Sequence, residues 1–236
     1  MNITDITITS IETLTAFDVV TGAYLFTLDE LQNVTIAQSE EKTDITGKQG
    51  RKLSTLKRNK AVTISGTNGM VSHGLLEKQT GGKFENKATE VLWTDYLTVQ
   101  SNAATTSYKA VGTAGEGKFA YDPANKALTF SGLDNGTEVV VYYKRKITAD
   151  VLDDMSDTYS GKATLYIDAL CEDKCANVYR LQIYVPKADF SGEFSFEMGD
   201  NQTVHEFEAD ALAGACGAGG QFFSYTVFGA NTADVA

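Results

Sequence analysis

Apolar and polar residues alternate along most of the chain with a period of two. Tyr24, Phe26 and Leu28 are typical, because in an extended strand their side chains fall on one face. The residues between such positions are mostly Thr, Ser, Glu, Asp, Gln and Lys. The same alternation recurs at Val34 and Ile36; Val62 and Ile64; Leu128 and Phe130; Leu165, Ile167 and Ala169; Leu181, Ile183 and Val185; Phe194, Phe196 and Met198; Phe223, Tyr225 and Val227. These segments predict strands with one buried and one solvated face.

Two segments depart from this alternation. Residues 137–146 (TEVVVYYKRK) are apolar on both faces in their middle, which predicts a central strand of a sheet. In residues 3–17, Ile6 and Ile8 share one face, but Ile11 breaks the register. A β-bulge, or a strand that passes from one sheet to another, would produce this change of phase.

Helical signals are few and short. Asn68 is a candidate N-cap for a helix over residues 69–80, which Gly81 would end. Four later apolar residues also stand at helical spacing: Val151, Leu152, Met155 and Tyr159. A helical turn is expected over residues 208–214. Roughly ten strands with one or two short helices predict an all-β sandwich or barrel.

Residues 38–60 (QSEEKTDITGKQGRKLSTLKRNK) fit neither pattern. The segment is polar, contains Gly47 and Gly50, and lies between two expected strands at residues 31–37 and 61–65. A loop of this length inside a compact domain is usually functional or disordered. Folded back as a hairpin, it would project on the order of 30 Å at ~3.3 Å per residue. Because an arm that long cannot bury itself on its own domain, we expect a long protruding hairpin loop.

Charge is distributed unevenly along the chain. The 20 Lys and Arg residues and 31 Asp and Glu residues give a net charge of −11, which opposes nucleic-acid binding by the whole molecule. Residues 48–60 nevertheless contain six cations and no acid, so the rest of the chain carries −17. The six cations are Lys48, Arg51, Lys52, Lys57, Arg58 and Lys60.

A cationic arm on an anionic body suits binding to another copy of the same protein. Head-to-tail contacts of this kind generate rings or open stacks, and opposite charge would steer the arm to its site. We therefore expect the six cations to lie at an interface between copies. Two alternatives remain open: a solvated mobile loop, and a nucleic-acid site. The anionic body and the lack of an aromatic residue in the arm argue against the second.

Membrane, secretory and metal signals are missing from the sequence. No stretch approaches the ~18–20 apolar residues of a membrane span, and residues 1–5 lack the features of a secretory signal. The cysteines are Cys171, Cys175 and Cys216. We expect them to be free thiols in a reducing compartment. Cys171 and Cys175 have no second pair of ligands to complete a zinc site, and His73 and His205 stand alone.

Catalytic motifs are also missing. Neither histidine belongs to a nucleophile or metal-binding motif, and no Gly-Gly pair is followed by the Lys-Ser/Thr of a phosphate loop. The carboxylate pairs Asp153-Asp154 and Glu40-Glu41 leave a glycosidase-like site open. Charged pairs on loops are usually solvated, so we expect neither an enzyme nor a cofactor.

Two groups of aromatic residues suit a sugar-binding platform. Trp93 stands near Tyr96, and Phe222, Phe223 and Tyr225 form the second group. Aromatic residues on strands belong to the core more often than to a binding site. We therefore expect core positions.

The order of the segments carries a further signal. In chain order, they are LFTLDEL (25–31), DITGKQGRK (44–52), AVTISGTNG (61–69) followed by a short helix, GKF (117–119), ALTF (127–130), GTEVVVYY (136–143), GEFSF (192–196) and HEF (205–207). In this order of elements, the chain resembles the major tail tube proteins of long-tailed bacteriophages.

That resemblance implies a structural virion protein with a β-sandwich or barrel-like tail-tube fold. Its copies would form hexameric rings that stack into a hollow tail tube, the conduit for DNA ejection. The arm at residues 38–60 would reach the next ring, and paired hairpins would line the channel as one continuous sheet. An anionic lumen would let DNA pass without binding it. Its partners would be other copies and the tape-measure, tail-terminator and baseplate proteins, with no membrane. Its location would be the virion tail after synthesis in the host cytoplasm.

We expect residues 1–236 to form one tail-tube-like domain with room for an inserted lobe at about residues 97–147. Two other functions remain open. A capsid-associated or head-decoration protein is also β-rich and self-assembling. A non-viral β-sandwich carbohydrate-binding module is the other, although the missing signal sequence argues against it.

Overall fold

The computed structural model describes residues 5–98, 119–122, 127–130, 136–195, 204–213 and 219–229. Most of these residues lie in antiparallel strands, which confirms the all-β prediction. The chain divides into two compact units. Unit 1 comprises Met1–Lys83 and Asp153–Ala236, and unit 2 comprises Phe84–Leu152.

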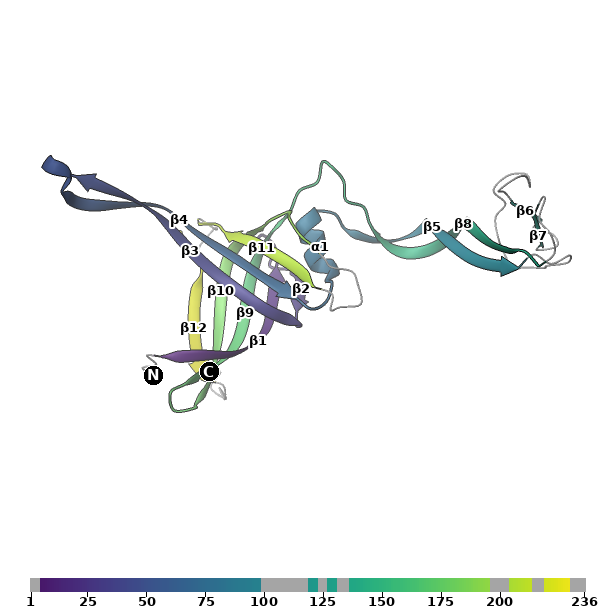
Figure 1. Cartoon of the computed structure of the whole chain (residues 1–236). Coiled ribbons are helices and arrows are strands. Elements are labelled where there is room, and N and C mark those ends of the chain that lie inside the picture. Colours follow the sequence, from purple (N-terminus) through teal and green to yellow (C-terminus); the bar gives the residue numbers. More distant parts are fainter. Residues whose placement is uncertain are drawn as a thin grey trace. The chain divides into compact units, whose positions relative to one another are not determined.

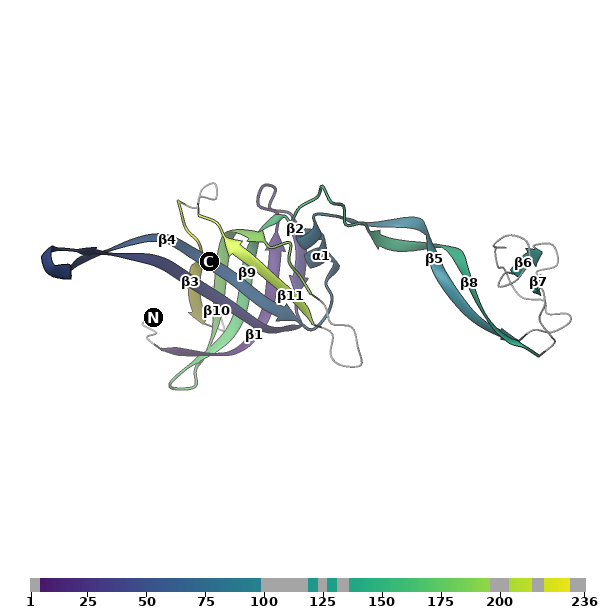
Figure 2. The same ribbon diagram turned by 45° about the horizontal axis from the view of Figure 1, so that its top comes forward.

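Unit 1 is built on one continuous antiparallel sheet. Its strands are β1 (Ile6–Phe17), β2 (Tyr24–Leu28), β3 (Leu31–Thr46), β4 (Lys52–Asn68), β9 (Lys162–Asp173), β10 (Val178–Phe190), β11 (His205–Ala211) and β12 (Ser224–Gly229). They are hydrogen-bonded in the order β2-β1-β9-β10-β11-β4-β3, and β12 pairs with β10 beside this path. In Figures 1 and 2, β3, β4 and β11 cross over β1, β9 and β10.

Strand β10 has two successive neighbours on one side. Its residues Tyr179–Tyr184 pair with β12, and its residues Ala188–Phe190 pair with β11. The register with β9 shifts between these stretches, where Pro186 lies. Proline has no N–H for the ladder and is found in sheets mainly at bulges and edges, and the Pro186 carbonyl accepts a hydrogen bond from Thr164 Oγ1 at 2.9 Å. This bulge lets one strand join two different neighbours.

The main core lies between the two crossing layers of unit 1. Fully buried side chains include Leu14 on β1, Ile64 on β4, Leu165 on β9 and Val185 on β10. Leu75 joins them from the helix. As the alternation predicted, each of the four strand residues lies on the side of its strand that faces the core. The other side of each strand points away from the core.

The register of β1 against β9 confirms the predicted irregularity in the first strand. The register shifts between Ile8 and Ser10 and again between Ile11 and Thr13. As a result Ile8, Ile11 and Leu14 all oppose residues of one face of β9 despite their uneven spacing. The bulges, and not a change of sheet, explain the phase of this segment.

Helix α1 (His73–Thr80) begins later than predicted. Its N-cap is Ser72, whose Oγ accepts a hydrogen bond from Leu75 N at 3.4 Å, whereas Asn68 Nδ2 donates to Met70 O. The predicted cap at Asn68 is therefore wrong. The predicted end is confirmed: Gly81 has φ 76°, and a Cβ there would stand 2.2 Å from a backbone oxygen.

Two other local predictions are wrong, and a third is contradicted at the one residue of it that the structure describes. Val151 and Leu152 end a strand, and turn and irregular chain follow in place of a helix. Residues 208–211 belong to β11, so no helical turn forms there. Phe194 lies in irregular chain, while Phe196 and Met198 lie outside the described residues.

In its described residues, unit 2 contains two separate two-stranded sheets. One pairs β5 (Phe84–Thr98) with β8 (Glu138–Leu152), and the other pairs β6 (Phe119–Asp122) with β7 (Ala127–Phe130). The apolar middle of β8 was predicted to be central in a sheet, but within the described residues β5 is its only hydrogen-bonded neighbour. Val141 and Tyr143 are buried in a small cluster with Leu128, which explains one apolar face of β8. We propose that unit 2 is the inserted lobe.

Removing unit 2 should leave unit 1 folded. Phe84 and Leu152 are directly paired, and opposite residues in a ladder stand about 5 Å apart. A short Gly-Ser linker from Lys83 to Asp153 therefore bridges the gap. We expect the shortened chain to keep a β-type circular dichroism spectrum and a cooperative thermal transition. A loss of cooperative unfolding would show that unit 1 depends on unit 2.

Candidate assembly surfaces

Strands β3 and β4 continue beyond the core as a two-stranded arm, defined as residues 38–60 (Figure 1). Their ladder extends through Thr43 opposite Leu56 and Ile45 opposite Ser54 to a 3₁₀ turn at Lys48–Gly50. No residue between 40 and 60 is buried. The predicted protruding hairpin is confirmed, and its strands are ordered almost to the tip.

A bulge separates the arm from the body. Between Ser39 and Glu41 the register shifts, so that Asn59 and Lys60 of β4 stand opposite one residue of β3. Asn59 has φ 50°, in the left-handed region that asparagine tolerates better than most residues. Its Nδ2 donates to Glu41 Oε2 at 2.7 Å. Such bulges bend a strand and increase its twist.

The hairpin neutralises part of the cationic strand. Lys52 Nζ lies 2.6 Å from Asp44 Oδ1, and Lys57 Nζ lies 3.0 Å from Glu40 Oε1. The neighbouring Lys57 and Lys42 lower the pKa of Glu40. Counting both strands, residues 38–60 hold seven cations and three acids, a net charge of +4. The six cations without an acid lie in residues 48–60 alone, and the acids of the partner strand lower the net charge of the whole arm.

The six predicted interface cations therefore divide into two groups. Besides the two paired lysines, Lys60 Nζ lies 5.8 Å from the centre of the Phe222 ring, at the base of the arm. Within the described part of the chain, Lys48, Arg51 and Arg58 form no ion pair. Lys48 and Arg51 lie at the tip, so the unpaired charge is concentrated there.

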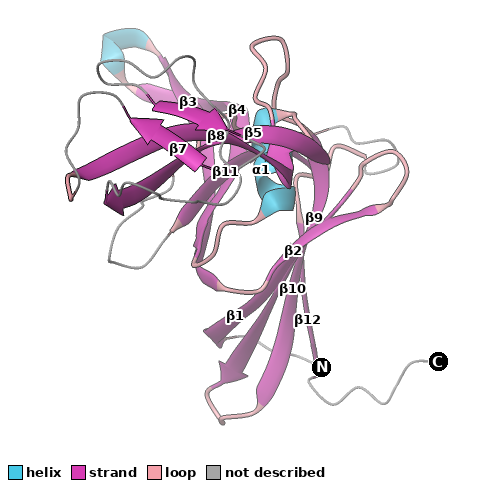
Figure 3. Cartoon of the chain, turned by 90° about the vertical axis from the view of Figure 1, so that its right-hand side faces the viewer, coloured by secondary structure: helices cyan, strands magenta, loops and turns pink. Residues whose placement is uncertain are grey.

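The second candidate assembly surface is an extension of unit 1 that consists of four strands. The four-stranded extension comprises residues 6–13 of β1, 168–173 of β9, 178–184 of β10 and 224–229 of β12. These strands project away from the rest of unit 1 (Figure 3). In the described residues, β1 pairs here only with β9, and β12 pairs only with β10. Both outer strands therefore leave one backbone edge open.

The two faces of the extension differ in polarity. Ala169, Cys171 and Leu181 are buried on the face that continues the core. Ile8 and Tyr225 lie at the margins of that face and are 53% and 50% exposed. The opposite face carries Thr7 and Thr13 of β1, Asp168 and Glu172 of β9, Arg180 and Gln182 of β10, and Thr226 of β12. Leu170, Val178, Tyr184 and Phe228 lie on this face too. Its charged residues are two acids and one cation, a small acidic excess, and we call it the polar face.

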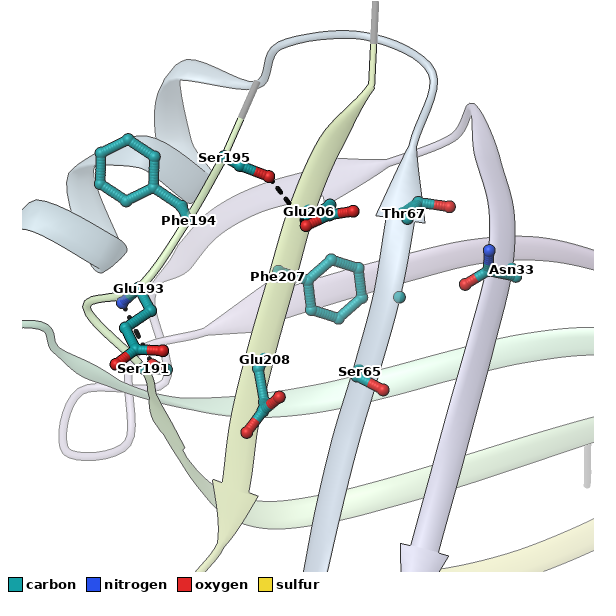
Figure 4. Close-up of a pocket in the computed structure, with 11 residues that line it drawn as sticks. Asn33, Ser65, Thr67, Ser191, Glu193, Phe194, Ser195, Glu206, Phe207 and Glu208 are labelled. Atoms are coloured by element: carbon teal, nitrogen blue, oxygen red, sulfur yellow. Dashed lines mark hydrogen bonds between the residues drawn. The ribbon is translucent and has the colours of Figure 1, made fainter. Parts of the chain in front are cut away.

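A third surface is a groove of about 450 Å³ beside β11. Its floor consists of small polar side chains, Asn33 on β3 and Ser65 and Thr67 on β4 (Figure 4). Glu206 and Glu208 project from β11, and the 191–195 segment that contains Glu193 runs beside them. Ser195 Oγ donates to Glu206 Oε2 at 2.8 Å. We call this surface the acidic groove.

The sequence places the chain in a known family. The model of the YomU/Tube protein family matches residues 6–224. The chain belongs to this family. It is a family of phage tail tube proteins, so the chain is a structural protein of the phage tail, and the resemblance inferred from the order of its segments is confirmed. Among curated proteins, none matches the chain.

The cysteines of this tube protein lie in different environments. Cys171 is buried and Cys175 is exposed in the turn between β9 and β10, while Cys216 lies outside the described residues. Burial raises the pKa of the Cys171 thiol. Among the described residues, no three His, Cys, Asp or Glu side chains form a group that could hold a metal ion. No described helix is long and apolar enough to cross a membrane.

Trp93 and Tyr96 were expected in the core, and that prediction is wrong, because they are 41% and 82% exposed. They do not form a sugar-binding platform either. Trp93 stands opposite Tyr143 and Tyr96 opposite Val140, which places the two rings on opposite faces of the β5–β8 ribbon. The two carboxylate pairs were expected to be solvated, and all four residues are exposed. Glu40 binds lysines on the arm, whereas Asp153 and Asp154 follow the end of β8.

His205 has a structural position that the sequence did not reveal. It is fully buried on β11, its Nε2 lies 2.8 Å from Gln79 Oε1, and its Nδ1 accepts a hydrogen bond from Ser72 N at 3.4 Å. This pattern fits the neutral ring with its proton on Nε2. Burial lowers the pKa of His205 below its ordinary value of 6.5.

Acid should therefore weaken unit 1 through His205. A histidine whose folded pKa is lowered contributes its full stability above the unfolded pKa of about 6.5 and loses that contribution as the pH falls below it. We expect the difference in free energy of unfolding between the wild type and His205→Gln to shrink from pH 7.5 to pH 5, measured by urea denaturation. A difference that is constant over this range would contradict the assignment.

Proposed function

We propose that copies of this tube protein close into rings through the four-stranded extension and that the rings stack into a hollow tail tube for DNA ejection. The observation that carries this proposal is the pair of open edges on β1 and β12. Open edges favour pairing with another chain. Family membership supports the same conclusion, because a tail tube requires many copies.

The strand directions suit ring closure. Neighbouring strands of the extension are all antiparallel, so β12 runs opposite to β1. Placing β12 of one copy beside β1 of the next therefore continues an antiparallel sheet without a break in direction. This contact joins two different surfaces, and such heterologous contacts close into rings when the rotation permits. A closed sheet has no open edge.

Strand spacing relates the number of copies to the width of the channel. With strands ~4.8 Å apart and tilted by about 40°, six copies with four strands each give a barrel ~48 Å across between backbones. Three copies would give ~24 Å, most of which side chains would fill. Six copies, the number implied by the resemblance, leave a wide channel.

The polar face of the extension is the one we assign to the channel. The opposite face is occupied by the core and by the cluster around Cys171, so it is already committed to packing. Asp168 and Glu172 against Arg180 give the polar face an acidic excess in each copy. Repeated around a ring, this charge would repel phosphate and let DNA slide.

The other parts of the proposal follow from tail-tube function. The arm would join successive rings, with its cations at the interface between copies. The tape-measure, tail-terminator and baseplate proteins would contact the inside and ends of the tube. The protein would be made in the host cytoplasm and would catalyse no reaction. Family membership favours this role over head decoration or carbohydrate binding.

Sedimentation velocity tests ring closure and stacking together. Over a series of protein concentrations, we expect a closed oligomer and, above it, much larger polymers, with little material of intermediate size. A protein that stays monomeric at the highest concentration, in low and high salt, would contradict the proposal.

A further inference from the structure

The acidic groove is lined by carboxylates within the described part of the chain. Glu193, Glu206 and Glu208 line it, and no Lys or Arg is among the described residues that do so. The three carboxylates form no group able to hold a metal ion. Negative charge spread along a groove suits an extended cationic segment better than a single ion.

The arm tip supplies positive charge that forms no ion pair with the described residues of its own chain. Lys48 is the first residue of the 3₁₀ turn and Arg51 follows its last, and both are exposed. Of the acids on the arm, Glu40 pairs with Lys42 and Lys57, and Asp44 pairs with Lys52. Glu41 accepts a hydrogen bond from Asn59 Nδ2. Leu53 adds an apolar side chain at the tip that is 61% exposed.

The tip and the groove lie at opposite ends of the same two strands. Asn33 stands near the start of β3 and Thr67 near the end of β4, whereas the tip joins the end of β3 to the start of β4. At ~3.3 Å per residue, the continuous ladder separates them by about 45 Å. The tip therefore cannot reach the groove of its own chain. A shift of one copy along the hairpin axis brings a tip toward the groove of another.

We propose that the arm tip of one copy docks in the acidic groove of a copy in the next ring, an inference that rests on the ring stacking proposed above. Lys48 and Arg51 enter the groove and meet Glu193, Glu206 and Glu208. Because tip and groove are different surfaces, each ring presents tips on one side and grooves on the other. The contact then repeats without limit along the tube.

Another cationic segment of the same chain is a weaker candidate for the groove. Lys144, Arg145 and Lys146 are consecutive on β8. However, Lys144 Nζ lies 3.8 Å from Glu90 Oε2, and the Arg145 guanidinium lies 5.1 Å from the centre of the Trp93 ring. Both charges therefore already have partners, unlike those of the arm tip.

Charge reversal on both sides tests the docking. Glu193→Lys with Glu208→Lys reverses the groove and leaves the bond between Ser195 and Glu206 intact. Lys48→Glu with Arg51→Glu reverses the tip. The matched control is Asp154→Lys with Asp157→Lys, which changes net charge as the groove variant does at exposed positions elsewhere in unit 1. Thermal unfolding confirms that each variant is folded.

We expect each reversal alone to raise the concentration needed for tube growth about tenfold or more, which corresponds to ~1.4 kcal/mol per contact. The control should match the wild type. Combining both reversals in one chain should restore growth, as should mixing the groove variant with the tip variant. Restored growth by the combined variant would also show that the single variants failed through charge and not through misfolding.

A carbodiimide, which joins amines to neighbouring carboxylates, tests proximity in the unaltered protein. We expect tubes, but not monomers, to yield a crosslink from Lys48 to Glu193, Glu206 or Glu208, identified by mass spectrometry. If the groove variant stacks like the wild type while the tip variant does not, the arm docks elsewhere and the inference is wrong, although the tube remains. If the wild type forms no tubes, the proposed function itself fails.

Discussion

Replacing residues 42–57 with an Asn-Gly turn is expected to abolish ring stacking while leaving the protein folded. Glu41 and Arg58 are directly opposite in the ladder, and a two-residue Asn-Gly turn closes such a pair. The main core includes no residue between 42 and 57, so the thermal midpoint should change little. Electron microscopy of negatively stained samples should show isolated rings in place of tubes.

A mixing experiment provides the control for this truncation. The shortened protein keeps the acidic groove, so it should accept arms from wild-type rings but offer none in return. Small amounts should therefore shorten wild-type tubes by capping one end. Normal tubes from the shortened protein, or no effect of mixing on tube length, would contradict the role of the arm.

A proline on the outer edge of β12 is expected to prevent ring closure. Successive N–H groups of a strand point to opposite sides, so of Thr226 and Val227 one donates toward β10 and the other toward the open edge. Proline at the outward position removes one donor and blocks the approach of another strand. That variant should remain a folded monomer, as measured by sedimentation velocity.

The two proline variants control for each other. Proline at the inward position breaks the ladder with β10 and should lower the free energy of unfolding by about 1–3 kcal/mol, the cost of a hydrogen-bonding group left without its partner. The more stable of Thr226→Pro and Val227→Pro is thus the one that tests assembly. Rings formed by this variant at wild-type concentrations would show that β12 is not the closing edge.

The sequence predicted features that arise from local patterns. Alternation identified the core face of β9. Side chains two residues apart on a strand point to the same face, and Leu165 and Ile167 are both buried on it. The broken phase at Ile11 predicted an irregularity in β1, either a bulge or a change of sheet, and the register shows bulges. The polar composition of residues 38–60 predicted the arm, because a segment without apolar residues on one face cannot pack on a core.

Features that depend on pairing between distant strands were not predictable. An apolar middle in β8 is compatible with a central strand, but a small cluster with Leu128 buries one face instead. Helical spacing at Val151 and Leu152 was overridden by pairing with β5. The groove could not be predicted from the sequence, because Glu193 and Glu208 come together only when the 191–195 segment folds beside β11.

The pairing of the arm's cations could not be predicted from the sequence either. Six cations in residues 48–60 were evident from the sequence. Which of them remain unpaired depends on the register that sets Lys57 opposite Lys42 and close to Glu40. The structure thus concentrates the available charge at Lys48 and Arg51.

Cryo-electron microscopy of polymers grown from the purified full-length protein tests the central claim most directly. We predict stacked rings around an open channel, with β1, β9, β10 and β12 of every copy forming one closed antiparallel sheet around it. The polar face with Asp168 and Glu172 should point into the channel. Filaments without a channel, or rings in which β12 and the next β1 are not neighbours, would contradict this account.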